Sequence, residues 1–251
     1  MKFNIIGPGK VGKSLYKCFL EKNYDVVLVD KNYNYNNILE GIVIITSQDE
    51  NIIPIWNNLK KYDISNIIAI GHCSGYLDSS FFEGIPHFSI HPNFPFSSII
   101  DCEKIKGITW GIEGDEKGIE FAKKIISILN GKYVIIPQNK KKLYHLAAVI
   151  TSNFSYGLIK MAKDIYNELD IDNIDHLIDL SIKSLNNIKE KGLKNALTGP
   201  VSRNDLKTIE DEGLVFKKFF GNQDVYDFFI NILYQIKEGE YEHKKNIEDE
   251  K

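Results

Sequence analysis

A glycine-rich turn near the start of the chain constrains its fold most strongly. The segment Lys2–Ile6 reads as a short buried strand, and Gly7–Pro8–Gly9–Lys10–Val11–Gly12 follows with the spacing G-x-G-x-x-G. A helical pattern comes next, and then an apolar run that ends at Asp30. A strand, a glycine turn, a helix and a second strand ending in an acid are typical of a dinucleotide site. The sequence therefore predicts an α/β domain that begins at its first residues.

Each glycine of the turn has its own expected role. Gly7 permits the tight turn, Gly9 lets the backbone approach a pyrophosphate, and Gly12 lets the helix pack close to the strand. The helix that follows directs its N-terminal N–H groups and partial positive charge at the phosphates. We therefore expect the cofactor-binding residues to include Gly7, Pro8, Gly9, Lys10, Val11 and Gly12. A Rossmann-like domain that has lost its nucleotide is the alternative.

The choice between NAD and NADP stays open in the sequence. Asp30 lies eighteen positions after Gly12, close to the spacing of an acid that accepts a hydrogen bond from a ribose 2′-hydroxyl, which favours NAD. Lys31 is the counter-argument, because its ammonium could pair with the 2′-phosphate of NADP. Thr46 and Ser47 follow the third expected strand, and we expect them near the ribose or the nicotinamide.

Composition excludes several classes of function. The chain has 251 residues, 43% of them hydrophobic, and a formal net charge of −3, which does not suggest a nucleic-acid surface. No apolar stretch approaches the length of a transmembrane helix, and the first apolar run is too short for a signal peptide. The three cysteines have no metal-like spacing, so we expect no metal site and a reduced, cytoplasmic setting.

The hydrophobic pattern divides the chain in two. Strands and helices alternate up to Pro137, and only helical patterns follow, which predicts a Rossmann-like parallel sheet over 1–137 and an all-helical domain over 138–251. The expected strands are 2–6, 26–29, 42–45, 67–70, 87–90, 108–111 and 133–136, and the first helices are 10–22, 51–59 and 115–129. The later helices are expected within 143–165, 174–188, 204–212 and 225–236.

Polar residues that follow the expected strands are the candidates for chemistry. In a doubly wound sheet the ligand lies beyond the carboxyl ends of the strands. His72 and Ser74 follow the fourth strand, and His91 follows the run 87–90. Histidine titrates near neutrality and can pass a proton while a hydride moves. The alternative for His72 is a hydrogen bond that only holds a turn.

Two further candidates lie on the first long helix of the second part. His145 and Asn153 interrupt an apolar stretch, and a buried polar group needs a partner, either a ligand or another side chain. Hydrogen bonds to the first domain are the alternative. Farther on, Gly199–Pro200 fixes a turn, Asn204 or Asp205 can cap the next helix, and Arg203 favours either a planar anionic partner or an ion pair within the domain.

Several motifs in order carry a resemblance to a known family. They are the glycine turn, His72–Cys73–Ser74–Gly75, His91–Pro92, the helix with Tyr144–His145 and Ser152–Asn153, and the segment from Ala196 to Asp205. Together they resemble a bacterial family that joins a Rossmann-like domain to a C-terminal helical domain of unassigned function. The layout is similar to pyrroline-5-carboxylate reductases, prephenate dehydrogenases and the F420-dependent NADP oxidoreductases. His91–Pro92 resembles the His–Pro of prephenate dehydrogenases, whose histidine acts on the substrate hydroxyl.

The resemblance implies a function and an assembly. It implies a nicotinamide cofactor, NAD or NADP, a small-molecule substrate in the interdomain cleft, and a homodimer formed through the helical domain. We expect an oxidoreductase that moves hydride to or from a small C–O or C–N centre. In it His91 would exchange the proton, Ser74 and His72 would polarise the reacting group, and His145 and Asn153 would position the substrate. A non-catalytic dinucleotide sensor is the alternative.

Overall fold

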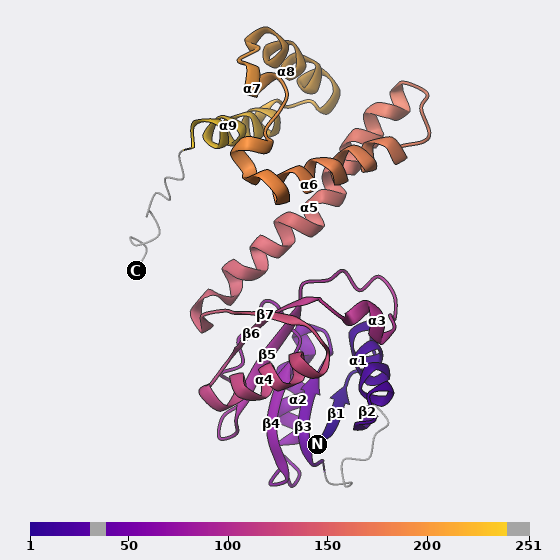
Figure 1. The fold of residues 1–251 in the computed structure, drawn as a ribbon, viewed down its shortest axis with the longest axis vertical. Coiled ribbons are helices and arrows are strands. Elements are labelled where there is room, and N and C mark those ends of the chain that lie inside the picture. The colour runs from indigo at the N-terminus through magenta and orange to yellow at the C-terminus, as the bar shows by residue number, and fades with distance from the viewer. Residues whose placement is uncertain (31–38, 240–251) are drawn as a thin grey trace. The chain divides into compact units, whose positions relative to one another are not determined.

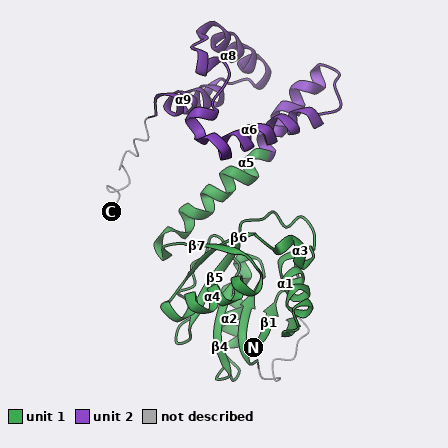
Figure 2. Cartoon of the chain, in the orientation of Figure 1, with its two compact units in different colours: residues 1–155 green, residues 156–251 purple. Residues whose placement is uncertain are grey.

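The computed structural model describes residues 1–30 and 39–239. The chain forms two compact units, Met1–Ser155 and Tyr156–Lys251, which divide inside the long helix α5 (Lys141–Glu168) rather than at Pro137 (Figure 2). None of the helices within the described ranges has the length and apolar character needed to cross a bilayer. The expected cofactor contact at Lys31 lies outside the described residues.

A seven-stranded sheet forms the centre of the first unit (Figure 1). Its strand order is β2-β1-β3-β4-β5-β6-β7, and all neighbours are parallel except β5 and β6. The chain reverses its direction of strand addition between β1 and β3, so the ligand crevice of such a sheet is expected at their carboxyl ends. The strands are β1 (Lys2–Ile6), β2 (Asp25–Val29), β3 (Gly41–Ile45), β4 (Ile67–His72), β5 (His87–Pro92), β6 (Thr109–Gly114) and β7 (Lys132–Ile135).

The two faces of the sheet carry separate hydrophobic cores. Successive strand residues point to opposite faces, so Phe3 and Ile5 join one core and Ile6 joins the other. Helices α1 (Lys10–Glu21), α3 (Cys102–Ile105) and α4 (Glu116–Ile128) supply the first core, and α2 (Asp49–Leu59) supplies the second with Trp56. Both faces of the parallel strands are therefore buried, which confirms the predicted α/β class.

Two strands run farther than their apolar residues indicated. The sequence placed His72 and His91 after β4 and β5, but both histidines lie inside those strands. His72 pairs with Ile45 of β3, and His91 pairs with Gly111 of β6. A strand continues as long as its neighbours supply ladder hydrogen bonds, whatever the polarity of its side chains.

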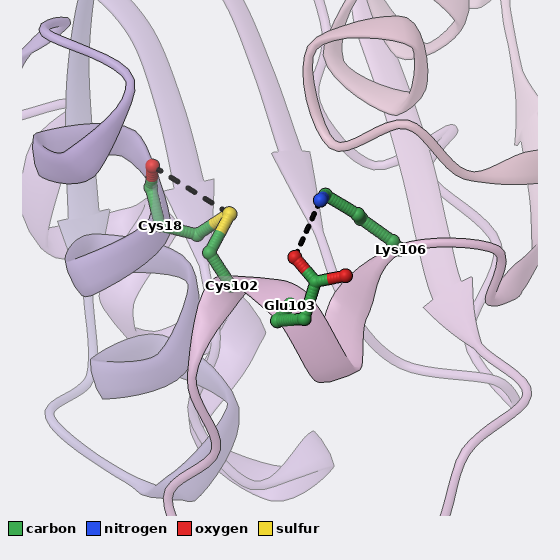
Figure 3. The surroundings of a disulfide bond; sticks show 4 residues. All are labelled: Cys18, Cys102, Glu103 and Lys106. Atoms are coloured by element: carbon green, nitrogen blue, oxygen red, sulfur yellow. Dashed lines mark hydrogen bonds and ion pairs between the residues drawn. A yellow bond between two sulfur atoms is a disulfide. The ribbon is translucent and has the colours of Figure 1, made fainter.

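A disulfide joins two helices of the first unit. Cys18 of α1 and Cys102 of α3 are bonded across 84 positions of sequence, next to the Glu103–Lys106 ion pair that Figure 3 also shows. Cys73 is a free, half-buried thiol. The expectation of three reduced cysteines is therefore wrong for the Cys18–Cys102 pair, because residues far apart in sequence meet where α3 packs on α1.

The second unit is helical, as predicted. After the end of α5 it contains α6 (Asp175–Ala196), α7 (Pro200–Arg203), α8 (Leu206–Phe220) and α9 (Asp224–Glu238), and α9 packs against α7 and α8 (Figure 1). The Asp205 side chain caps α8 by accepting from the Thr208 N–H at 3.2 Å. Arg203 lies 3.9 Å from Asp205, so the capping residue and the local ion pair considered from the sequence are both present.

Candidate functional site

The glycine turn after β1 is closely packed at two of its glycines and open at the third. Gly7 has φ of 114°, and a Cβ there would lie 2.8 Å from the Ser47 hydroxyl. A Cβ on Gly12 would overlap the Gly7 carbonyl oxygen and the Thr46 hydroxyl, whereas nothing lies within 4 Å of a Cβ on Gly9. The backbone at Gly9 therefore faces open space, which is the cradle that a pyrophosphate needs.

Residues after β3 support this turn. The Thr46 hydroxyl lies 2.7 Å from the Gly7 carbonyl oxygen and 3.2 Å from that of Ile6, so its one proton is shared mainly with Gly7 and Thr46 holds the turn in place. A pocket of about 370 Å³ opens beside it, and its lining includes Gly7, Pro8, Asp30 and Ser47. Among the other expected contacts, Lys10 is exposed and Val11 packs partly into the core. The turn and the pocket together fit the adenosine and phosphate end of a dinucleotide.

His72 and Ser74 hydrogen-bond within the loop that follows β4. The buried His72 ring accepts from the Ser74 N–H at Nδ1, 3.1 Å, so its Nε2–H donates to the Asp78 carbonyl at 3.2 Å. Burial, with the nearby Lys141 charge, lowers the pKa of His72 to about 3. The Ser74 hydroxyl accepts from the N–H groups of Tyr76 and Leu77. Both side chains therefore hold this loop in place. For His72 this agrees with the alternative expectation of a hydrogen bond that holds a turn.

His91 belongs to a short hydrogen-bond chain that sets its tautomer. The Tyr144 hydroxyl donates to Asn93 Oδ1 at 2.8 Å, and it lies 2.9 Å from His91 Nδ1. A phenol has one proton to donate, so His91 must donate its own Nδ1 proton to Tyr144. The lone pair of His91 is then at Nε2. Burial, together with the charges of Lys141 and His145, lowers the pKa of His91 to about 4, so Nε2 is a neutral acceptor at pH 7.

His145 lies beside His91, and Asn153 lies farther along α5. The centroids of the two imidazole rings are 5.8 Å apart. A Cβ on Gly75 would lie 2.9 Å from His91 Nε2 and 2.7 Å from His145 Nδ1, so the loop after β4 needs a glycine where it meets both rings. His145 Nδ1 is buried and has no hydrogen-bond partner among the described residues. Asn153 is exposed two turns later.

A buried charged network lies next to these residues, and sequence reasoning did not identify it. Lys141 is 2% exposed, and its ammonium donates to the Ser74 carbonyl oxygen and the Ser89 hydroxyl, each at 2.9 Å. Ser89 in turn donates to Glu113, which also accepts from Ser79. The alternation of polar and apolar residues along β5 could have indicated Ser89. Lys141 carried no signal, because it stands in a run of five basic or amide side chains, residues 138–142.

The topology brings the turn and the histidines to one edge of the sheet. Strands β1, β3, β4 and β5 are parallel, so their carboxyl ends share an edge. That edge carries the glycine turn, Thr46, the Gly75 loop and His91. A dinucleotide bound at the turn and a proton acceptor at His91 Nε2 are therefore compatible with proton-coupled hydride chemistry. Nowhere in the described part of the chain do three or more His, Cys, Asp or Glu residues group so as to hold a metal ion.

Comparisons with known proteins agree with this fold. The model of a domain of unknown function, DUF2520, matches residues 108–227. Protein TM1727 from Thermotoga maritima is 33% identical, with a TM-score of 0.81 over 94% of this chain and 98% of that one. A candidate NADP oxidoreductase, BF3122 from Bacteroides fragilis, is 18% identical, with a TM-score of 0.74 over 93% of this chain and 98% of that one.

A third solved structure, Plasmodium falciparum pyrroline carboxylate reductase with NADP bound, is 14% identical, with a TM-score of 0.60 over 94% of this chain and all of that one. At such identities the second and third structures establish a shared fold: an N-terminal Rossmann sheet followed by helices. No curated protein matches the chain.

Proposed function

The chain belongs to the same family as protein TM1727 from Thermotoga maritima, and on that premise we propose that it is an NAD(P)-dependent oxidoreductase. The proposed reaction moves a hydride between the nicotinamide ring and a small substrate with a reacting C–O or C–N bond. Similar folds that bind NADP, such as the Plasmodium pyrroline carboxylate reductase, support the cofactor class. The bound cofactor would supply the hydride acceptor or donor, and the protein would supply binding, orientation and proton exchange.

One observation carries the proposal: the open cradle at Gly9 and the acceptor at His91 Nε2 share one edge of the sheet. A neutral imidazole with a free lone pair accepts a proton from a hydroxyl or amine as its carbon loses hydride. The reverse reaction returns that proton to the product oxygen or nitrogen. In this proposal His91 is the general base, and Tyr144 and Asn93 keep its Nδ1 protonated.

The other predicted residues take supporting roles. His145 presents an unpaired buried Nδ1 beside His91, and we assign it a hydrogen bond that orients the substrate. Ser74 and His72 shape the Gly75 loop through their own bonds, and a direct role in polarising the substrate stays a prediction. Asn153 is exposed on α5, and its proposed contact with substrate is likewise a prediction.

Turnover of reduced cofactor tests the central claim. NADH or NADPH consumption is measured against a panel of keto acids and cyclic imines, and alcohol and amine oxidation is measured in reverse. His91→Gln keeps a polar side chain but lacks the base, and we expect kcat to fall about 100-fold or more. Cofactor binding by calorimetry should not change in this variant.

Binding of the cofactor without turnover of any substrate would instead favour a dinucleotide sensor. Absence of cofactor binding below millimolar concentration would refute both functions.

Asp30 provides a test of cofactor choice. Its carboxylate lines the pocket beside the glycine turn, where it would accept from a ribose 2′-hydroxyl and repel a 2′-phosphate. We expect Asp30→Asn to improve the ratio of NADPH to NADH affinity by about tenfold, that is ~1.4 kcal/mol. Calorimetric titration of both cofactors into both proteins measures the ratio. An unchanged ratio would show that Asp30 does not face the ribose.

We also propose a homodimer formed through the helical part. Large apolar side chains are more than half exposed on three helices, and their burial against a second copy of the chain would stabilise a dimer. These residues are Leu180, Ile182 and Leu185 of α6, Leu214 and Val215 of α8, and Phe228 of α9. Light scattering during gel filtration should give twice the chain mass, and Leu185→Glu combined with Phe228→Glu should lower it. A monomeric wild-type protein at micromolar concentration would contradict this proposal.

A further inference from the structure

Lys141 is buried at the first residue of α5, an unusual place for a charge. Its ammonium bonds to two different elements: the Ser74 carbonyl oxygen in the loop after β4 and the Ser89 hydroxyl in β5. Burial lowers the pKa of this lysine to about 8. A helix could be attached to a sheet by apolar contacts alone, and these are often more stable than buried charges. The choice of a lysine therefore requires an explanation.

Glu113 compensates the buried charge. It is 2% exposed and accepts from Ser89 at 3.1 Å, so one serine hydroxyl links ammonium and carboxylate. Ser79 donates to the same carboxylate from its N–H at 3.0 Å and from its hydroxyl at 3.1 Å. Each hydrogen bond in this network requires a defined donor–acceptor geometry, whereas apolar packing does not. The network thus fixes where the start of α5 lies and how it is rotated.

The same helix face carries the partners of His91. Tyr144 and His145 follow Lys141 by three and four positions, so the three side chains project from one side of the helix. Ser89 precedes His91 by two positions in β5 and points to the same face of the sheet. Tyr144 also packs where Gly111 has no side chain, directly across from His91. A small rotation of α5 would separate the Tyr144 hydroxyl from His91 Nδ1.

We propose that Lys141 is a positioning residue: its buried link through Ser89 to Glu113 sets the rotation of α5 so that Tyr144 holds His91 in the Nδ1–H tautomer. The inference rests on the proposed role of His91 as a base, since only this tautomer leaves the Nε2 lone pair free. Lys141 itself does not contact the reacting atoms in this proposal.

The test reads the tautomer directly and needs no turnover. Two-bond proton–nitrogen NMR of the full chain labelled with ¹⁵N-histidine reports which ring nitrogen carries the proton, and His91→Gln identifies the signals of His91. The wild type should show a protonated Nδ1 and an unprotonated Nε2. Lys141→Met should lose this fixed tautomer, and both nitrogens should move toward averaged shifts. Lys141→Arg, which retains a buried donor, should restore part of the wild-type pattern.

Two further variants keep the result decisive. Lys142→Met changes the neighbouring exposed lysine, which lies over the Tyr76 ring, and it should leave the His91 signals unchanged. If Lys141→Met does not fold, the double variant Lys141→Met with Glu113→Gln removes both buried charges and should still lose the tautomer. A folded Lys141→Met or double variant that keeps the wild-type tautomer would overturn the proposal. That result would leave the oxidoreductase assignment, which cofactor turnover tests, unaffected.

Discussion

Gly12 and Gly9 belong to the same turn, but the structure gives them opposite surroundings. A Cβ on Gly12 would overlap the Gly7 carbonyl oxygen, whereas a Cβ on Gly9 meets nothing within 4 Å. Gly12 is therefore required by the packing of the protein itself. Gly9 is required only if a ligand approaches the backbone. At the scale of single residues, stability and binding can be separated.

We expect Gly12→Ala to lower the free energy of unfolding by about 1–3 kcal/mol, because a new methyl group must displace backbone. Gly9→Ala should leave stability within about 0.5 kcal/mol of the wild type and weaken dinucleotide binding. Chemical denaturation and calorimetric titration of both variants measure the two effects. If Gly9→Ala bound NADH and NADPH as tightly as the wild type, the cradle would not contact phosphate.

The buried histidines predict a pH dependence of stability. The pKa of His91 is about 4 and that of His72 about 3, chiefly because burial disfavours the charged ring. Between these values and about 6.5, the unfolded chain binds protons that the folded protein does not. The free energy of unfolding should therefore decrease as pH falls from about 6.5 toward 4.

His91→Gln should reduce this loss by on the order of 2–3 kcal/mol between pH 7 and 4.5, because one neutral buried ring is removed. Urea denaturation at the two pH values, compared within each protein, gives the measurement. Equal losses in the wild type and the variant would show that His91 is not held neutral by the fold.

At the scale of elements, the first turns of α5 meet the antiparallel pair β5–β6. Gly111 of β6 leaves the space that the Tyr144 ring fills, opposite His91. Gly157, later in α5, has no neighbour within 4 Å of a Cβ. The two glycines therefore have different roles. Gly111 makes room for a side chain of α5, whereas Gly157 is an open position within α5 itself.

We expect Gly111→Ala to lower the free energy of unfolding by about 1–3 kcal/mol, and with it the thermal unfolding midpoint. The variant should also disturb the His91–Tyr144 hydrogen bond. Gly157→Ala, the matched control, should raise stability by about 0.5–1 kcal/mol, since alanine favours helix over glycine. Differential scanning calorimetry compares them. A Gly111→Ala protein as stable as the wild type would mean that α5 does not pack closely on β6.

At the scale of the whole molecule, the Cys18–Cys102 disulfide closes a loop that includes much of the sheet. Thiol titration of the denatured, unreduced protein should give one reactive thiol per chain, from Cys73. Three thiols would show that the bond does not form. Replacing both bonded cysteines with alanine should lower the free energy of unfolding by about 4–5 kcal/mol, the loop-closure contribution for a loop of this length.

Apolar periodicity and the glycine spacing predicted most of the elements and the change from alternating strands and helices to helices alone. Strand ends were less accurate, since His72 and His91 are polar yet belong to strands that their neighbours extend. Within the candidate site, the histidines could be named from their positions after apolar runs. The bonds of Ser74, Lys141 and Glu113 could not, because they join segments distant in sequence.

The sequence by itself determined the α/β class, the position of the glycine turn and the change to helices, because local spacing and side-chain size act within a few residues. Only the tertiary structure decided the antiparallel β5–β6 pair, the disulfide and the tautomer of His91. Each of these depends on which distant segments meet and on which atom donates to which. The glycine turn thus follows from sequence spacing, whereas the free lone pair at His91 Nε2 follows from a helix that begins fifty residues later.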